Sequence, residues 1–156
     1  MTKWSIYLEV KGVKGVKEVK GHMKQLKNMK TYSFENVIAW QKAHQFVLLT
    51  YQVTRHFPEE EKFGLTSQFR RAAISIEANI AEGYKKISKA DKLRFYNIAQ
   101  GSLEECRDYH LLSRDLGYLF GNEFDLLHAS IEETSKFLNS YCKAISDNVA
   151  MKEDPI

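Results

Sequence analysis

Four consecutive stretches of this chain repeat their apolar residues at alternating spacings of three and four, and this pattern restricts the fold more than any other feature. The last stretch is unbroken over three heptads, in the series Phe124, Leu127, Ile131, Thr134, Leu138, Tyr141 and Ile145. Such spacing places one apolar side chain per turn on the same face of an α-helix. The period of two that indicates a half-buried strand does not occur after residue 34. The sequence therefore predicts an all-α fold.

The first two predicted helices are separated by a short link that contains a proline. The first covers about 35–56 and ends before Pro58, because a residue that precedes proline disfavours helical backbone angles. The second covers about 65–86, and its core-facing positions become smaller and more polar toward Asn79 and Gly83. A polar amide and a glycine on the packing side of a helix indicate either a tight helix crossing or a functional site.

The last two predicted helices begin and end at residues that are typical of helix termini. Ser88 lies three residues before Asp91, a spacing that resembles a capping box and starts the third helix. Gly117 is a suitable C-terminal cap for that helix. Asn122 starts the fourth helix, and Asp125 supplies an acidic first turn that suits the helix dipole.

Four long helices joined by short links favour an antiparallel up-down-up-down four-helix bundle. The chain has 156 residues, which is enough for one domain with its own core, and only two prolines interrupt it. We expect the bundle to cover residues 31–148, with a short C-terminal tail over residues 149–156.

The N-terminal segment, residues 1–30, differs from the rest of the chain in charge. Residues 1–33 carry eight lysines and two glutamates, a balance of +6, so the total of +3 leaves −3 for the remainder. Between Lys11 and Gly21 the pattern Val-Lys-Gly/Glu repeats with a period of three, which fits neither a helix nor a strand. We expect the segment to be flexible unless a partner orders it, as a basic arm for RNA would be. Alternatively it is an extension that precedes the true start, because Met23 and Met29 are internal start candidates.

The sequence contains no strong signature of an enzyme, a metal site or a cofactor site. The Gly-rich phosphate-binding motifs are absent, and a di-iron bundle would need paired Glu-x-x-His motifs where this chain has a single Asp125-x-x-His128. Cys106 and His110 lie four residues apart on the third helix, but the cysteine falls in an apolar stripe. We expect a packed thiol there rather than a nucleophile, and no enzymatic activity, metal or cofactor.

Localisation is predicted from two further features of the sequence. No apolar run is long enough to span a bilayer, and the N-terminus has no continuous apolar segment of the secretory kind. Cys106 and Cys142 do not have the spacing of zinc ligands, and unpaired cysteines are typical of a reducing cytosol. We therefore expect a cytoplasmic protein.

Cations gather around the link between the second and third helices. They are Lys85, Lys86, Lys89, Lys92 and Arg94, and Asp91 is the only acidic residue among them. Arg70 and Arg71 lie earlier on the second helix, and Tyr84 beside the cluster either stacks on a base or packs against the bundle. These seven cations are the predicted nucleic-acid contacts, because clustered lysine and arginine side chains bind phosphates. The alternative interpretation is a solvated helix end whose lysines favour the C-terminal dipole.

Three runs of sequence together resemble a known bacterial family. The runs are FENVIAWQKAH, FPEEEKFGLTSQFRRAAISIEANIAEGYKK and FYNIAQGSLEE. They are similar to the four-helix-bundle proteins linked to intervening sequences in 23S rRNA genes, and the resemblance covers about residues 31–145. That family also resembles the accessory protein of diversity-generating retroelements, a pentameric barrel that associates with a reverse transcriptase and nucleic acid. The resemblance implies a non-enzymatic, homopentameric protein with RNA, or an RNA-associated protein such as a reverse transcriptase, as its partner.

The family motif also includes polar residues on the second and third helices, and this chain matches them. They are Gln68, Arg70, Arg71, Ser75, Asn79, Glu82 and Gly83, followed by Ser102 and Glu105. We predict that Gln68, Ser75, Asn79, Glu82, Ser102 and Glu105 form a buried network. In it, Asn79 would bond Ser102 or Glu105, and Gly83 would allow a close helix approach. Such a network fixes the register between helices when every member is satisfied.

Two functional hypotheses follow from these observations. The first is an oligomeric module that binds RNA or an RNA-associated partner through the seven cations. The second is a scaffold for protein partners without nucleic-acid contact, because the chain has more aromatic residues than one small bundle needs.

Overall fold

The computed structural model describes residues 33–147, so the predictions for residues 1–30 and 149–156 lie outside the described residues. Four helices dominate this part of the chain: α3 (Ile38–Val53), α4 (Leu65–Lys85), α5 (Lys89–Asp115) and α6 (Gly121–Asp147). Three short 3-10 helices accompany them: η1 (Phe34–Asn36), η2 (Thr54–His56) and η3 (Glu59–Glu61).

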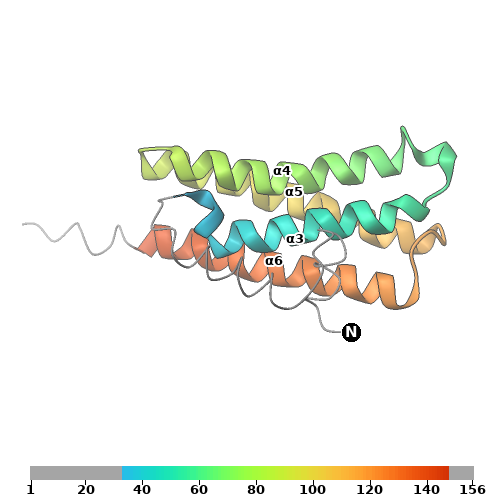
Figure 1. Ribbon diagram of the computed structural model, residues 1–156. Helices are drawn as coiled ribbons and strands as arrows, with labels where there is room; N and C mark the ends of the chain where they lie inside the picture. Colours follow the sequence, from blue (N-terminus) through green and yellow to red (C-terminus); the bar gives the residue numbers. More distant parts are fainter. Residues whose placement is uncertain (1–32, 148–156) are drawn as a thin grey trace, which may run out of the picture. The chain divides into compact units, whose positions relative to one another are not determined.

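The four helices pack as an antiparallel bundle, which confirms the predicted all-α architecture (Figure 1). Each helix contacts two neighbours: α4 lies against α3 and α5, and α6 lies against α3 and α5. The link between α4 and α5 therefore lies at the same end of the bundle as the C-terminus of α6 and the N-terminus of α3 (Figure 1). Within residues 33–147, no helix is both long and apolar enough to cross a membrane.

The predicted helix boundaries are accurate for α4 and α5 and less so for the other two. Ser88 caps α5 by accepting a hydrogen bond from the backbone N–H of Asp91, as its spacing predicts. The prediction of one continuous helix over 35–56 was wrong, because Val37 is extended (φ −77°, ψ 117°) and separates η1 from α3. Helix α6 begins at Gly121, whose positive φ of 58° turns the chain into the helix one residue earlier than predicted.

Large apolar side chains from all four helices fill the core. Phe46 of α3, Phe69 of α4, Tyr96 of α5 and Leu127 of α6 are all fully buried. On α4 the buried stripe continues through Ile76 and Ile80 to Gly83, so these positions fix which side of α4 faces the core. That rotation determines where the polar motif residues lie.

Candidate functional site

A short chain of hydrogen bonds joins α4 to α5 at the polar motif. The Ser75 hydroxyl on α4 lies 2.8 Å from the Ser102 hydroxyl on α5. The Asn79 Nδ2 donates to the Ser75 carbonyl at 2.7 Å and to the Ser75 hydroxyl at 3.1 Å. Ser102 is buried, whereas Ser75 and Asn79 are half-buried. These contacts cross between the two helices at one level of the bundle.

The other predicted members of this network do not belong to it. Gln68, Glu82 and Glu105 are exposed, and Glu105 accepts a hydrogen bond from the Tyr109 hydroxyl at 2.7 Å instead of meeting Asn79. The physical reason is the rotation of α4, because its core stripe passes through Ile76 and Ile80 and leaves Asn79 at the edge of the helix contact. The prediction of a fully buried network was therefore wrong, and the motif forms a smaller polar contact beside the core.

Gly83 lies at a close contact between α4 and α5. A Cβ atom at this position would lie 2.6 Å from the Tyr96 Cε1 and 3.1 Å from the Phe95 Cβ. Tyr96 is fully buried and its ring packs against Tyr141, with 5.3 Å between the ring centroids. Any larger residue would therefore displace a ring that has no free space beside it.

The outward side of α4 and α5 carries a surface that we term the α4–α5 face. By helical spacing and exposure it consists of Arg71, Ile74, Ala78 and Glu82 on α4, and Ile98, Gly101, Glu105, Leu112 and Leu116 on α5. Four large apolar side chains on it are exposed by 39–47%, and an added Cβ at Gly101 would meet nothing within 4 Å. The Ser75–Ser102 contact lies between the two rows. Exposed apolar side chains that recur along one face are typical of an interaction surface.

Two of the predicted phosphate contacts, Lys89 and Lys92, bond backbone carbonyls at the ends of neighbouring helices. The Lys92 ammonium donates to the Tyr84 carbonyl at 2.8 Å, near the C-terminus of α4. The Lys89 ammonium donates to the Ser146 carbonyl at 2.8 Å, near the C-terminus of α6. Each lysine satisfies a carbonyl that lacks a partner within its own helix. Lys89 and Lys92 therefore fix the link between α4 and α5 to both neighbouring helix ends.

Three other cations remain at this end of the bundle, and we call Lys85, Lys86 and Arg94 the basic tip. The Lys86 ammonium lies 4.5 Å and the Arg94 guanidinium 4.9 Å from the centroid of the Phe95 ring. Arg94 is also 3.9 Å from Asp91, an exposed contact that contributes little to stability. Lys85 is exposed, and within residues 33–147 it makes no ion pair.

Arg70 and Arg71 do not join the basic tip. The Arg70 Nε donates to the Thr54 hydroxyl at 2.8 Å, and its guanidinium lies 4.6 Å from the centroid of the Tyr51 ring. Arg70 therefore faces α3 and η2. Arg71 is exposed on the α4–α5 face. The seven predicted cations thus occupy three separate regions, because successive residues of α4 point about 100° apart.

The sequence profile of the family described as 23S rRNA-intervening sequence protein matches residues 35–140. This range includes all of α3, α4 and α5 and most of α6. The chain belongs to this family. The match confirms the resemblance to the 23S rRNA-intervening sequence proteins, and no curated protein matches the chain.

The fold of this 23S rRNA-intervening sequence family member is similar to a solved structure. That structure is the crystal structure of a protein of unknown function from the S23 ribosomal protein family, from Bacteroides thetaiotaomicron VPI-5482. The two share 25% sequence identity with a TM-score of 0.63, and the match covers 68% of this chain and 96% of the other. The four-helix core is therefore common to both proteins.

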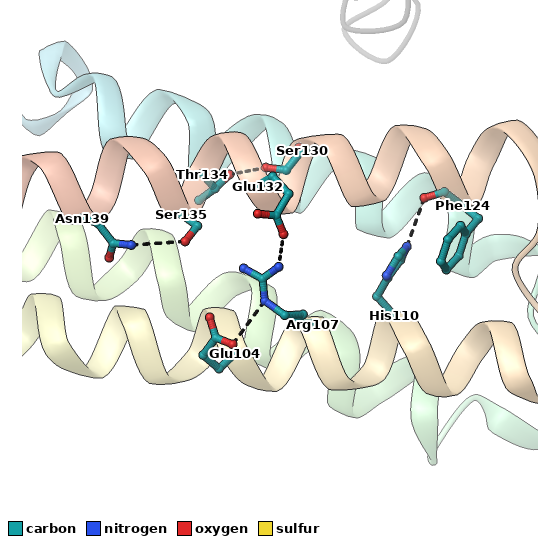
Figure 2. Close-up of polar contacts among 9 residues, drawn as sticks. All are labelled: Glu104, Arg107, His110, Phe124, Ser130, Glu132, Thr134, Ser135 and Asn139. Carbon is teal, nitrogen blue, oxygen red and sulfur yellow. Dashed lines mark hydrogen bonds and ion pairs between the residues drawn. The ribbon is translucent and has the colours of Figure 1, made fainter.

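In this family member the two pairs considered for catalysis have different surroundings: Cys106 and His110 are buried, whereas Asp125 and His128 are exposed. Cys106 is buried, and burial raises the pKa of its thiol, so the reactive thiolate is disfavoured. The His110 Nε2 donates to the Phe124 carbonyl at 3.0 Å, and the two rings stack at 4.1 Å (Figure 2). Asp125 and His128 are exposed, and residues 33–147 contain no group of three side chains that could hold a metal ion.

The burial of His110 also predicts how the free energy of unfolding depends on pH. The His110 side chain is fully buried, and its Nδ1 has no hydrogen-bond partner among the described residues. Burial lowers the pKa of His110 below the ordinary value of 6.5, and the nearby positive charges of His128, Arg114 and Arg107 lower it further. The unfolded chain therefore binds this proton more readily than the folded one. The contribution of neutral His110 to the free energy of unfolding should be fully present above about pH 6.5. The free energy of unfolding should fall as the pH drops below that value, by at most about 1.4 kcal/mol per pH unit.

Urea unfolding at several pH values between 5.5 and 8 tests this prediction. The variant His110→Gln keeps a donor near the Nε2 position but does not titrate, so its stability should depend less on pH in this range. The other described histidines stay in both proteins, so the difference between the two curves isolates His110. Parallel curves would contradict the prediction.

Sequence reasoning missed one polar contact between α3 and α4. The His44 Nδ1 lies 2.7 Å from the Glu77 Oε2, and the His44 ring stacks on Trp40 with 4.9 Å between the centroids. A second missed contact joins α5 to α6, where Arg107 pairs with both Glu104 and Glu132 (Figure 2). His44 and Glu77 are 33 residues apart, so no local pattern pairs them.

Proposed function

We propose that this protein is a non-enzymatic assembly module that holds RNA, or an RNA-associated protein, through the basic tip and self-associates through the α4–α5 face. The observation that carries the RNA part is the basic tip itself. Lys85, Lys86 and Arg94 gather at one end of a domain whose residues after 33 have a net charge of −3. A local cluster of cations against an acidic background favours a phosphate ligand at that place.

Two features of the basic tip support phosphate binding over a purely solvated helix end. The Phe95 ring lies beneath both Lys86 and Arg94, so these two long side chains are partly ordered before any ligand arrives. Lys89 and Lys92 hold the underlying link by their carbonyl contacts. A preorganised cation cluster loses less conformational entropy when it binds an anion.

Reversing the charge of the basic tip should weaken RNA binding at least tenfold. If all three side chains contact phosphates, their contribution to the salt dependence is a slope of about −2 to −2.7, which is a 20- to 40-fold loss between 50 and 200 mM salt. The variant is Lys85→Glu/Lys86→Glu/Arg94→Glu. Affinity for a structured RNA, measured by fluorescence anisotropy across this salt range, should fall and become less sensitive to salt.

A matched control reverses three exposed cations that lie outside the basic tip. Arg55, Lys62 and Lys136 are exposed, and Arg55→Glu/Lys62→Glu/Lys136→Glu changes the net charge by the same amount. This control should bind RNA nearly as well as the wild type. Equal losses in the two variants would indicate an effect of net charge alone and would contradict a specific role for the basic tip.

The α4–α5 face favours a second candidate function, a scaffold for protein partners without RNA contact. A protein partner could cover the exposed apolar side chains of this face with apolar side chains of its own, whereas a nucleic acid has no apolar strip of that kind. The two candidates differ in one measurement. A charge-reversed basic tip that retains every cellular partner would favour the scaffold.

The self-association that we propose is a ring of identical subunits, with five as the number that the family resemblance suggests. A ring requires head-to-tail contacts between two different surfaces of each subunit. The α4–α5 face would supply one of these surfaces. Light scattering of the purified protein at micromolar concentration gives the mass directly, and a monomer would refute the ring.

A further inference from the structure

The apex of the link between α4 and α5 is an isoleucine. Helix α4 ends at Lys85 and α5 begins at Lys89, so the link has three residues. Lys86 and Ser88 on either side have extended backbone angles, with ψ of 140° and 144°. Ile87 lies between them with its side chain fully exposed, at 101% of the reference value. It is the most exposed of the large apolar side chains among the described residues.

This isoleucine has a rigid support. Lys92 bonds the carbonyl of Tyr84 just before the link, and Lys89 just after the link bonds the carbonyl of Ser146 on α6. The Ser88 hydroxyl caps α5 through the N–H of Asp91. The link is therefore anchored to three helix ends, and an apolar side chain projects from it into water.

Cations of the basic tip lie near the isoleucine in the sequence and at the same end of the bundle. Lys85 and Lys86 precede it in the sequence, and Arg94 shares the Phe95 ring with Lys86. A ligand that covers this apex must therefore have an apolar group that packs against Ile87 and negative charges around that group. RNA has this combination wherever a base is unstacked, because the base offers an apolar ring face next to phosphates.

Fully paired RNA does not offer the same surface. In an A-form duplex the ring faces are covered by neighbouring bases, and the accessible groove presents hydroxyls and base edges. An aliphatic side chain cannot form hydrogen bonds with these groups. An anionic membrane also combines charge with apolar surface, but stable membrane attachment requires more apolar area than one aliphatic side chain provides.

We propose that Ile87 packs against an unpaired base, so that the basic tip selects RNA with a bulge, loop or end over continuous duplex. This inference rests on the proposed RNA function and specifies which class of RNA the same site takes. The cations would supply most of the affinity, and Ile87 would supply the preference between RNA structures. Apolar side chains inserted at base steps have the same role in proteins that bind distorted nucleic acids.

The test compares two RNA hairpins with the same stem, one fully paired and one with a single-nucleotide bulge. The full-length protein should bind the bulged hairpin about fivefold more tightly in 150 mM salt. Ile87→Ala should bind both hairpins equally, with affinity for the paired hairpin unchanged. The matched control is Ile38→Ala, because Ile38 is an exposed isoleucine, at 53%, on the first turn of α3. This control should keep the preference.

Each outcome distinguishes this inference from the proposed function. If the wild type binds both hairpins equally, or if Ile87→Ala keeps the preference, the inference is wrong while RNA binding stands. If the wild type binds neither hairpin, both fail. Sedimentation with phosphatidylserine vesicles is the last arm, and vesicle binding that Ile87→Ala abolishes, without RNA binding, would assign the apex to a membrane and overturn the inference.

Discussion

Replacing Gly83 with alanine is expected to lower the free energy of unfolding by about 1–3 kcal/mol, although alanine is the better helix former. The added Cβ would lie 2.6 Å from the Tyr96 ring and 3.1 Å from the Phe95 Cβ. The Tyr96 ring is fully buried against Tyr141 and cannot move aside without opening the core. The overlap therefore outweighs the gain of about 1 kcal/mol that alanine normally gives inside a helix.

Gly101 provides a matched control on α5. It is also a helical glycine, but it is exposed and an added Cβ would meet nothing within 4 Å. Gly101→Ala should therefore stabilise the single subunit by about 1 kcal/mol, which is the helix propensity difference alone. Urea unfolding measures both variants at a low protein concentration where the chain is monomeric, because Gly101 lies on the α4–α5 face and the stability of an oligomer depends on concentration. A Gly83→Ala protein as stable as Gly101→Ala would show that the close contact does not exist.

The helices could be predicted from the sequence because their signals are local. The predicted range 65–86 agrees with α4 at Leu65–Lys85, and the capping role of Ser88 was also predicted correctly. Each signal involves residues within one or two helical turns. The break at Val37 was missed because nothing in the sequence opposes a continuous helix there, and η1 contacts the distant helix α4 as well as α3.

The polar motif and the cations were harder to predict because their contacts cross between helices. Asn79 and Ile80 are adjacent, and only the packing of α4 against its neighbours decides that Ile80 is buried and Asn79 lies at the edge. Lys89 bonds a carbonyl 57 residues away on α6. A sequence shows that lysines cluster, but it does not show which carbonyls lack partners near them.

The two proposed surfaces use different residues and adjoin only near Ile98, one helical turn after Arg94, so the proposed functions are separable by mutation. The basic tip lies at the link between α4 and α5, whereas the apolar row of the α4–α5 face extends along α5 to Leu116 at the other end of that helix. A ring built through the α4–α5 face would leave each basic tip at the end of its subunit. Several tips in one assembly would then bind a long RNA more tightly than one tip alone.

Replacing Ile98 with glutamate is expected to convert an assembled protein into monomers. Ile98 is 43% exposed in the isolated chain and lies on the same row as Leu112 and Leu116. In an assembly that covers this row, the new carboxylate would be removed from water, and the nearest cation on its helix, Arg94 one turn earlier, already contacts Asp91 and the Phe95 ring. An unpaired buried charge costs several kcal/mol, so association should weaken by at least a hundredfold. The fold itself should be unaffected, because the side chain points outward.

The control is Leu111→Glu, because Leu111 is similarly exposed, at 39%, on the same helix but outside the α4–α5 face. Sedimentation velocity at matched micromolar concentrations should give the wild-type mass for Leu111→Glu and a single-chain mass for Ile98→Glu. Circular dichroism should give the same helix content for all three proteins. An Ile98→Glu protein that keeps the assembled mass would exclude this face as the contact surface. If both variants dissociate, charge anywhere on α5 would be sufficient, and the row of Ile98, Leu112 and Leu116 would have no specific role in assembly.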